Sequence, residues 1–152
     1  SESNTEASIK IIKEMVKKYN FDLVEAPVSS TSEIFPAANS LVGKCDVFFA
    51  PADNTVLSGL EAFVKVSRTN NIPLFVGDEG SVEKGGIATF GVDYYELGKE
   101  TGKLIIKVLE GENISDIPVV INNSGKLIVN EEALKYFKIK IPEKYSQQEV
   151  IK

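Results

Sequence analysis

The chain has 152 residues, of which 43% are hydrophobic and 26% are charged, a balance typical of a globular protein. Its formal net charge of -5 argues against a nucleic-acid partner, which requires a basic face. Without histidine, and with a single cysteine, the chain cannot build a His-based triad, a Cys or His metal cluster or an internal disulfide. The composition therefore predicts neither a metal nor another cofactor.

The first third of the chain predicts two helices around a strand. Hydrophobic side chains recur every three or four residues over 5–19, which indicates an amphipathic helix. Residues 21–28 have the composition of a short strand. Ser30 and Glu33 have the spacing of a capping box, so we expect a helix that starts there and ends at Gly43.

The middle of the chain predicts two strands on either side of a helix. Residues 46–50 form a continuous apolar run, which is typical of a strand covered on both faces. The apolar spacing over 54–68 predicts a helix, and 72–77 resembles a second buried strand. Residues 78–86 are polar and glycine-rich, so we expect a long loop or crossover.

The last third continues the alternation of strands and helices. Its predicted elements are strands at 87–92, 117–121 and 126–130, a turn at NNSG between the last two, and helices at 94–110 and 131–137. Such an alternation with short loops predicts an α/β fold in three layers, a parallel sheet flanked by helices.

Ligands of open parallel sheets bind beyond the carboxyl ends of the strands, where loops and helix N-termini converge. The polar residues expected there supply carboxylates, hydroxyls, an amide and an aromatic ring, a set that suits a small zwitterion. No residue among them predicts catalysis. The candidate ligand-binding residues are Ser3, Asn4, Ser30, Thr31, Asp53, Asn54, Thr55, Asp78, Glu79, Asp93 and Tyr94.

Each candidate also has a structural alternative. Ser30 and Asn54 have an adequate role as helix caps, which contribute about 1 kcal/mol each. An Asp53 beside Asn54 exceeds what one cap requires. Asp78, like the glutamate after it, has the alternative of a solvated loop carboxylate, and Tyr94 that of a packing residue.

Two reactive roles for Asp53 have less support. A receiver domain would place its phosphorylated Asp at a strand end, but it would also need a lysine that "PLFVGDE" lacks. A carboxylate-pair hydrolase built from Asp53 and Asp78 has no predicted geometry. Neither GxGxxG nor GxxxxGK[ST] occurs, so nucleotide binding has no motif.

Three segments carry a family resemblance: "APADNTVLSGLEAF", "IPLFVGDEGSVEKGGIATFGVDYYELGKETGKLIIKVLEGE" and "IPVV...KLIVNEEALKYFKIKIPE". Together they resemble the ABC-transporter substrate-binding proteins of the TrpX-like family, which have a type I periplasmic-binding-protein fold. Several members are thought to bind aromatic amino acids. The resemblance runs through nearly the whole chain, and the first two segments together are its most specific part.

Members of that family are longer two-lobed proteins, so the resemblance implies that this chain is a C-terminal part. Residues 1–84 would form the second lobe without its first strand. Residues 85–116 would be the crossover segment that completes the first lobe, and 117–152 would return to the second lobe and form the tail. The apolar face of the helix at 94–110 would then be uncovered, so we expect the fragment to self-associate.

The resemblance implies a non-enzymatic, solute-binding component of an ABC importer that closes two lobes over an aromatic or other amino acid. Its partners would be the permease and the ATPase of the importer. It would be a lipoprotein or periplasmic protein outside the cytoplasm, with its signal outside this chain. The candidate ligand-binding residues would line the cleft, with Asp93 and Tyr94 near the hinge. The alternative is a ligand-sensing domain of a regulator or receptor with the same fold.

Overall fold

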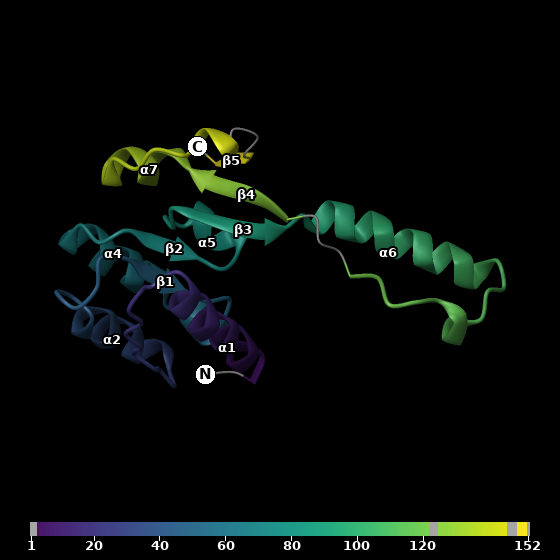
Figure 1. The fold of residues 1–152 in the computed structure, drawn as a ribbon, viewed down its shortest axis with the longest axis horizontal. Helices are drawn as coiled ribbons and strands as arrows, with labels where there is room; N and C mark the ends of the chain where they lie inside the picture. Colours follow the sequence, from purple (N-terminus) through teal and green to yellow (C-terminus); the bar gives the residue numbers. More distant parts are fainter. Residues whose placement is uncertain (1–2, 122–124, 146–148, 152) are drawn as a thin grey trace.

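The computed structural model describes residues 3–121, 125–145 and 149–151 (Figure 1). Three short 3-10 turns accompany its helices and strands. The elements are α1 (Ser3–Lys18), η1 (Thr31–Glu33), α2 (Ile34–Ser40), β1 (Phe48–Ala50), α3 (Asn54–Ser58), α4 (Leu60–Asn70), β2 (Leu74–Val76), α5 (Glu79–Glu83), β3 (Ala88–Val92), α6 (Tyr94–Leu109), η2 (Ile114–Asp116), β4 (Gly125–Asn130), α7 (Glu131–Phe137), η3 (Glu143–Tyr145) and β5 (Glu149–Ile151).

The strands form two adjoining sheets, and the predicted α/β class is confirmed. β1 and β2 pair in parallel, with Phe48 opposite Leu74. β4 pairs in parallel with β5, but β3 and β4 run antiparallel, which differs from the wholly parallel sheet expected from the sequence. The amide of Ile87, the residue before β3, donates to the carbonyl of Leu74 on β2 at 2.8 Å. The two sheets therefore adjoin at β2 and β3.

The main core lies between the β1–β2 sheet and the helices α2 and α4. Phe48, Leu60 and Leu74 are almost fully buried there, and the rings of Phe48 and Phe63 pack with their centroids 5.1 Å apart. Each large apolar side chain that is removed from water contributes about 1.5–3 kcal/mol. A second, smaller cluster around Val129 holds α7 against β3 and β4.

The predicted strand at 21–28 is absent, and the strand at 46–50 is not covered on both faces. Phe21 is 69% exposed, and Val47 and Phe49 are each 49% exposed. A strand requires a neighbouring backbone for its hydrogen bonds. In the described part of the chain β1 pairs only with β2, and residues 21–28 make no ladder with either strand.

Two further predictions of loops and strands were wrong. Residues 78–86 contain the short helix α5, because the Asp78 side chain accepts the amide proton of Ser81 and starts a helical turn. Residues 117–121 form no strand. The strand β5 was not predicted, and most of the NNSG turn, residues 122–124, lies outside the described residues.

The capping box was also wrong. The Ser30 side chain makes no cap hydrogen bond, and the Glu33 carboxylate accepts instead from the amide of Ser29 at 2.7 Å. The tighter 3-10 turn η1 lies between Ser30 and α2, which changes the spacing that a capping box requires. α2 ends at Ser40, and Gly43 follows in a turn with φ of 76°.

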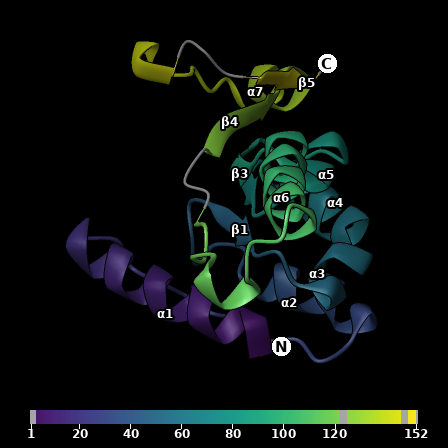
Figure 2. The ribbon, with the colours of Figure 1, turned by 90° about the vertical axis from the view of Figure 1, so that its right-hand side faces the viewer.

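The predicted helices at 5–19 and 94–110 are confirmed as α1 and α6. We call the described residues before 93 and after 124, which hold both sheets, the body; α6 lies apart from it. Figures 1 and 2 show α6 and the segment after it projecting from the sheets; we call residues 93–121 the arm. No residue of α6 is buried, and Leu109 is 81% exposed. No helix within the described ranges has both the length and the apolar character that crossing a membrane requires.

Asn130 offers a direct test of how α7 is held on the body. Its buried side chain accepts the amide proton of Ala133 and donates to the carbonyl of Val82, both at 2.9 Å. We expect Asn130→Ala to lower the free energy of unfolding by about 2 kcal/mol, measured by chemical denaturation. The amide of Ala133 then loses its acceptor, and the carbonyl of Val82 loses its donor. The control Asn39→Ala removes one exposed bond and should change stability by less than about 0.5 kcal/mol. Equal effects of the two variants would contradict this role.

Candidate functional site

Asp53 follows the end of β1 closely, and the residue is 2% exposed. One carboxylate oxygen, Oδ1, accepts the amide protons of Thr55 and Val56 at 2.9 and 3.2 Å. The other, Oδ2, accepts the hydroxyl proton of Thr5 at 2.9 Å. Asp53 is therefore the cap of α3, a role that the sequence assigned to Asn54, and it also ties α1 to the end of β1.

The hydrogen bond from Thr5 brings the first turn of α1 to the strand end. Ser3 and Asn4 precede Thr5 in that turn, so their backbone lies at the same edge as Asp53. The side chains of Ser3 and Asn4 are outside what the structure describes. Sequence reasoning missed Thr5, because a contact across 48 residues leaves no local pattern.

The loops after β1 and β2 lie against each other. A Cβ atom on Gly77 would stand 2.7 Å from the backbone nitrogen of Ala52, so only glycine allows this approach. The next residue, Asp78, caps α5 by accepting from the amide of Ser81 at 3.0 Å, and it also accepts from the Ser81 hydroxyl. The structure thus places the loop of Asp78 beside the loop of Asp53.

Asp93 and Tyr94 lie where β3 enters the arm. Oδ1 of Asp93 accepts the amide protons of Tyr95 and Glu96, and Oδ2 lies 3.0 Å from Nζ of Lys126 on β4. The pKa of the Asp93 carboxyl lies below its ordinary value. The largest cause is the hydrogen bond from the amide of Glu96, followed by the Lys126 ammonium; the amide of Tyr95 adds to them. Tyr94 is 70% exposed, so it is not a packing residue in this structure.

The remaining candidates lie on short turns. Thr31 begins η1 and Ser30 directly precedes it; the Ser30 hydroxyl lies 3.0 Å from that of Ser32. The methyl group of Thr31 packs at Gly59, between α3 and α4. Glu79 is the first residue of α5 and is half-buried.

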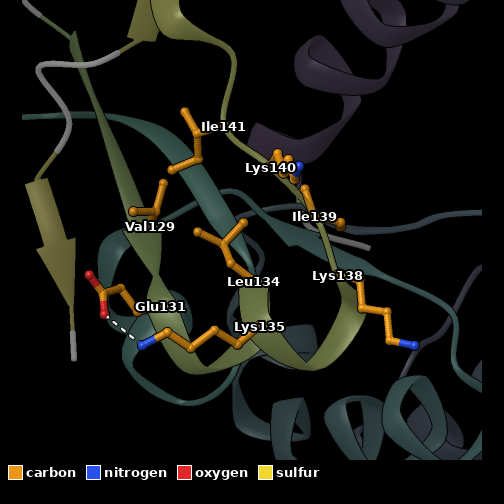
Figure 3. A pocket seen from close by; sticks show the side chains of 8 residues that line it. All are labelled: Val129, Glu131, Leu134, Lys135, Lys138, Ile139, Lys140 and Ile141. Atoms are coloured by element: carbon orange, nitrogen blue, oxygen red, sulfur yellow. Dashed lines mark hydrogen bonds and ion pairs between the residues drawn. The ribbon is translucent and has the colours of Figure 1, made fainter.

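A large described cavity lies away from these residues. It measures about 550 Å³ and is formed by β4, α7 and the segment after α7 (Figure 3). Val129, Leu134 and Ile141 point toward one another there, whereas the Lys138 side chain extends away. None of the candidate residues lines it. The candidate residues therefore lie outside this cavity.

The family follows from a match over almost the entire chain. A family model described as "ABC transporter substrate binding protein" matches residues 1–150. The chain belongs to this family. A tyrosine-binding protein of Clostridioides difficile (strain R20291) is 41% identical over 135 residues, which are 89% of this chain and 39% of the relative. The resemblance to ABC-transporter substrate-binding proteins inferred from the sequence is confirmed.

Solved structures of the same kind share the fold. The ligand-free, open structure of a substrate-binding protein with adhesive properties from Clostridium difficile matches with a TM-score of 0.84 and 36% identity, over 100% of this chain and 51% of that one. An ABC domain in complex with L-Trp from Streptococcus pneumonia matches with a TM-score of 0.83 and 30% identity, over 99% of this chain and 52% of that one. The chain thus spans about half the length of these structures.

The bond between Thr5 and Asp53 should be visible in stability. Thr5→Val keeps the shape of the side chain but removes the hydroxyl that donates to a buried carboxylate. We expect it to lower the free energy of unfolding by about 1–3 kcal/mol in chemical denaturation. Thr5→Ser should recover most of this loss, and Thr101→Val, which removes an exposed bond within α6, should have little effect. If Thr5→Val and Thr101→Val behave alike, the Thr5 hydroxyl contributes nothing.

The contacts of Asp93 predict its titration. Because its folded pKa is lower than the unfolded value of about 3.9, the bonds that it makes stabilise the fold above that pH and are lost as the pH falls through the lowered pKa. Carboxyl ¹³C NMR should show Asp93 titrating below the ordinary value of an aspartate. Lys126→Gln should move the Asp93 pKa upward. An Asp93 pKa at the ordinary value would contradict the described geometry.

Proposed function

We propose that this chain is part of a solute-binding protein of an ABC importer that takes up an aromatic or other amino acid. The observation that carries the proposal is the buried Asp53 carboxylate, held where α1 and α3 begin and beside the loop of Asp78. The names of a tyrosine-binding relative and of an L-Trp complex support the same ligand class. Nothing in this arrangement calls for a catalytic role.

The candidate residues divide the recognition of an amino acid among them. The negative charge of the Asp53 carboxylate suits the ligand ammonium. Ser3, Asn4 and the N-terminal turn of α1 suit the ligand carboxylate. The exposed ring of Tyr94 suits an aromatic side chain. Ser30, Thr31, Asn54, Thr55, Asp78, Glu79 and Asp93 complete the proposed site.

We propose further that two lobes close over the solute. The body would belong to one lobe and the arm would serve the other. This division is narrower than the crossover of residues 85–116 expected from the sequence, because β3 pairs with β4 and Ile87 is buried in the body. The exposed apolar side chains of α6 support this division, because a helix with no buried residue lacks the packing that normally stabilises it. The same apolar side chains would drive self-association of the chain when the other lobe is not present.

The remaining parts of the proposal follow from the family. The partners would be the permease and ATPase of the importer, and the protein would act outside the cytoplasm, in the periplasm or as a lipoprotein on the cell surface. The TrpX-like group is the proposed place of this chain within the family. These statements concern a whole protein. This chain covers 39% of the tyrosine-binding relative and 51% of the open substrate-binding structure.

Calorimetry on the full natural protein tests the ligand class. We expect heat of binding with L-tryptophan, L-tyrosine or L-phenylalanine. Asp53→Asn should weaken that binding at least tenfold, because asparagine preserves a helix cap but removes the negative charge that faces an ammonium.

The matched control is Asp22→Asn, which changes the same net charge at an exposed position. Its affinity should equal that of the natural protein. If none of the three aromatic amino acids gives heat of binding, an aromatic ligand is refuted. Unchanged affinity of Asp53→Asn would leave Asp53 with its structural role alone.

A further inference from the structure

The body and the arm are joined by two chain crossings that lie side by side. β3 leads into α6 at Val92 and Asp93, and the chain returns to the body at Gly125, where β4 begins. Val92 stands opposite Gly125 in the antiparallel pair of β3 and β4. Both crossings therefore leave the body from the end of a single two-stranded ladder.

One carboxylate bridges the two crossings. Oδ1 of Asp93 accepts the first amide protons of α6, from Tyr95 at 3.0 Å and Glu96 at 3.1 Å. Oδ2 of the same group pairs with Nζ of Lys126 at 3.0 Å, one residue beyond the return crossing. The first turn of the arm is thereby connected to β4 through a side chain as well as through the backbone.

On the body side of this junction, Gly125 lies close to its neighbours on β3. A Cβ atom on Gly125 would stand 2.5 Å from the ring of Phe90 and 3.3 Å from the carbonyl oxygen of Gly91. Beyond the junction α6 does not pack into the body, since no residue of α6 is buried. The direction in which the arm leaves the body thus depends on the junction and not on packing along the helix.

We propose that the Asp93–Lys126 ion pair is a latch that sets the direction of the arm relative to the body. If the arm belongs to a second lobe, a step that rests on the proposed function, the latch biases the angle between the lobes. The pair is partly exposed, with side-chain exposures of 23% for Asp93 and 39% for Lys126. An exposed pair of this kind shifts populations up to about fivefold, which is enough to bias a hinge without locking it.

The latch can be tested by measuring the arm directly. In the full natural protein, spin labels at Glu61→Cys on α4 and Lys107→Cys on α6, with native cysteines replaced, report the distance between body and arm by pulsed electron paramagnetic resonance. We expect Lys126→Gln to broaden and shift the distance distribution. Asp93→Asn retains a capping side chain but loses the charge, so it should produce the same change. The double variant should add nothing to either single variant.

The matched control is Lys103→Gln, which removes an ion pair that lies wholly within α6. It should leave the distribution unchanged. The latch is refuted if Lys126→Gln and Asp93→Asn both retain the natural distribution, or if Lys103→Gln has the same effect as they do. A shifted distribution in a protein that binds no aromatic amino acid would support the latch and contradict the proposed function. An unshifted distribution in a protein that binds one would do the reverse.

Discussion

The buried carboxylate of Asp53 is the constraint on which the candidate site depends. A carboxylate removed from water is strongly destabilising unless donors surround it. Its donors come from two places, the first turn of α3 and Thr5 in the first turn of α1. Satisfying one buried group therefore fixes the end of β1 and the starts of two helices relative to one another. The polar groups proposed to hold a solute are positioned by the same hydrogen bonds that stabilise the fold.

The same local device recurs along the chain. Asp53, Asp78 and Asp93 each follow a strand closely, and Asn130 ends one; in every case the side chain accepts amide protons of the helix that comes next. A strand followed by an acidic or amide cap places an oxygen-rich side chain at the strand end. Structural capping and solute binding are thus compatible uses of one residue, and the presence of a cap does not argue against a binding role.

The body and the arm differ in what stabilises them. The body has two apolar clusters in which side chains such as Phe48 and Val129 are almost fully buried. The arm depends on its own helical hydrogen bonds, on short-range ion pairs such as Lys99–Glu96, and on the junction at Asp93. This contrast agrees with a chain that spans about half of its structural relatives, since a helix with exposed apolar residues normally gains its stability from a packing partner.

The sequence by itself determined the α/β class, the long helices α1 and α6, the strands β2 and β4, and the resemblance to ABC-transporter substrate-binding proteins. These features depend on periodicity and on contiguous motifs, which local residues fully specify. Only the tertiary structure decided that residues 21–28 form no strand, that β3 and β4 run antiparallel, and that Ser30 makes no cap hydrogen bond. It alone revealed the contacts of Asp53 with Thr5 and of Asp93 with Lys126. Strand pairing and ion pairs join residues that are distant in the chain, and their energy depends on a neighbour that no local pattern identifies.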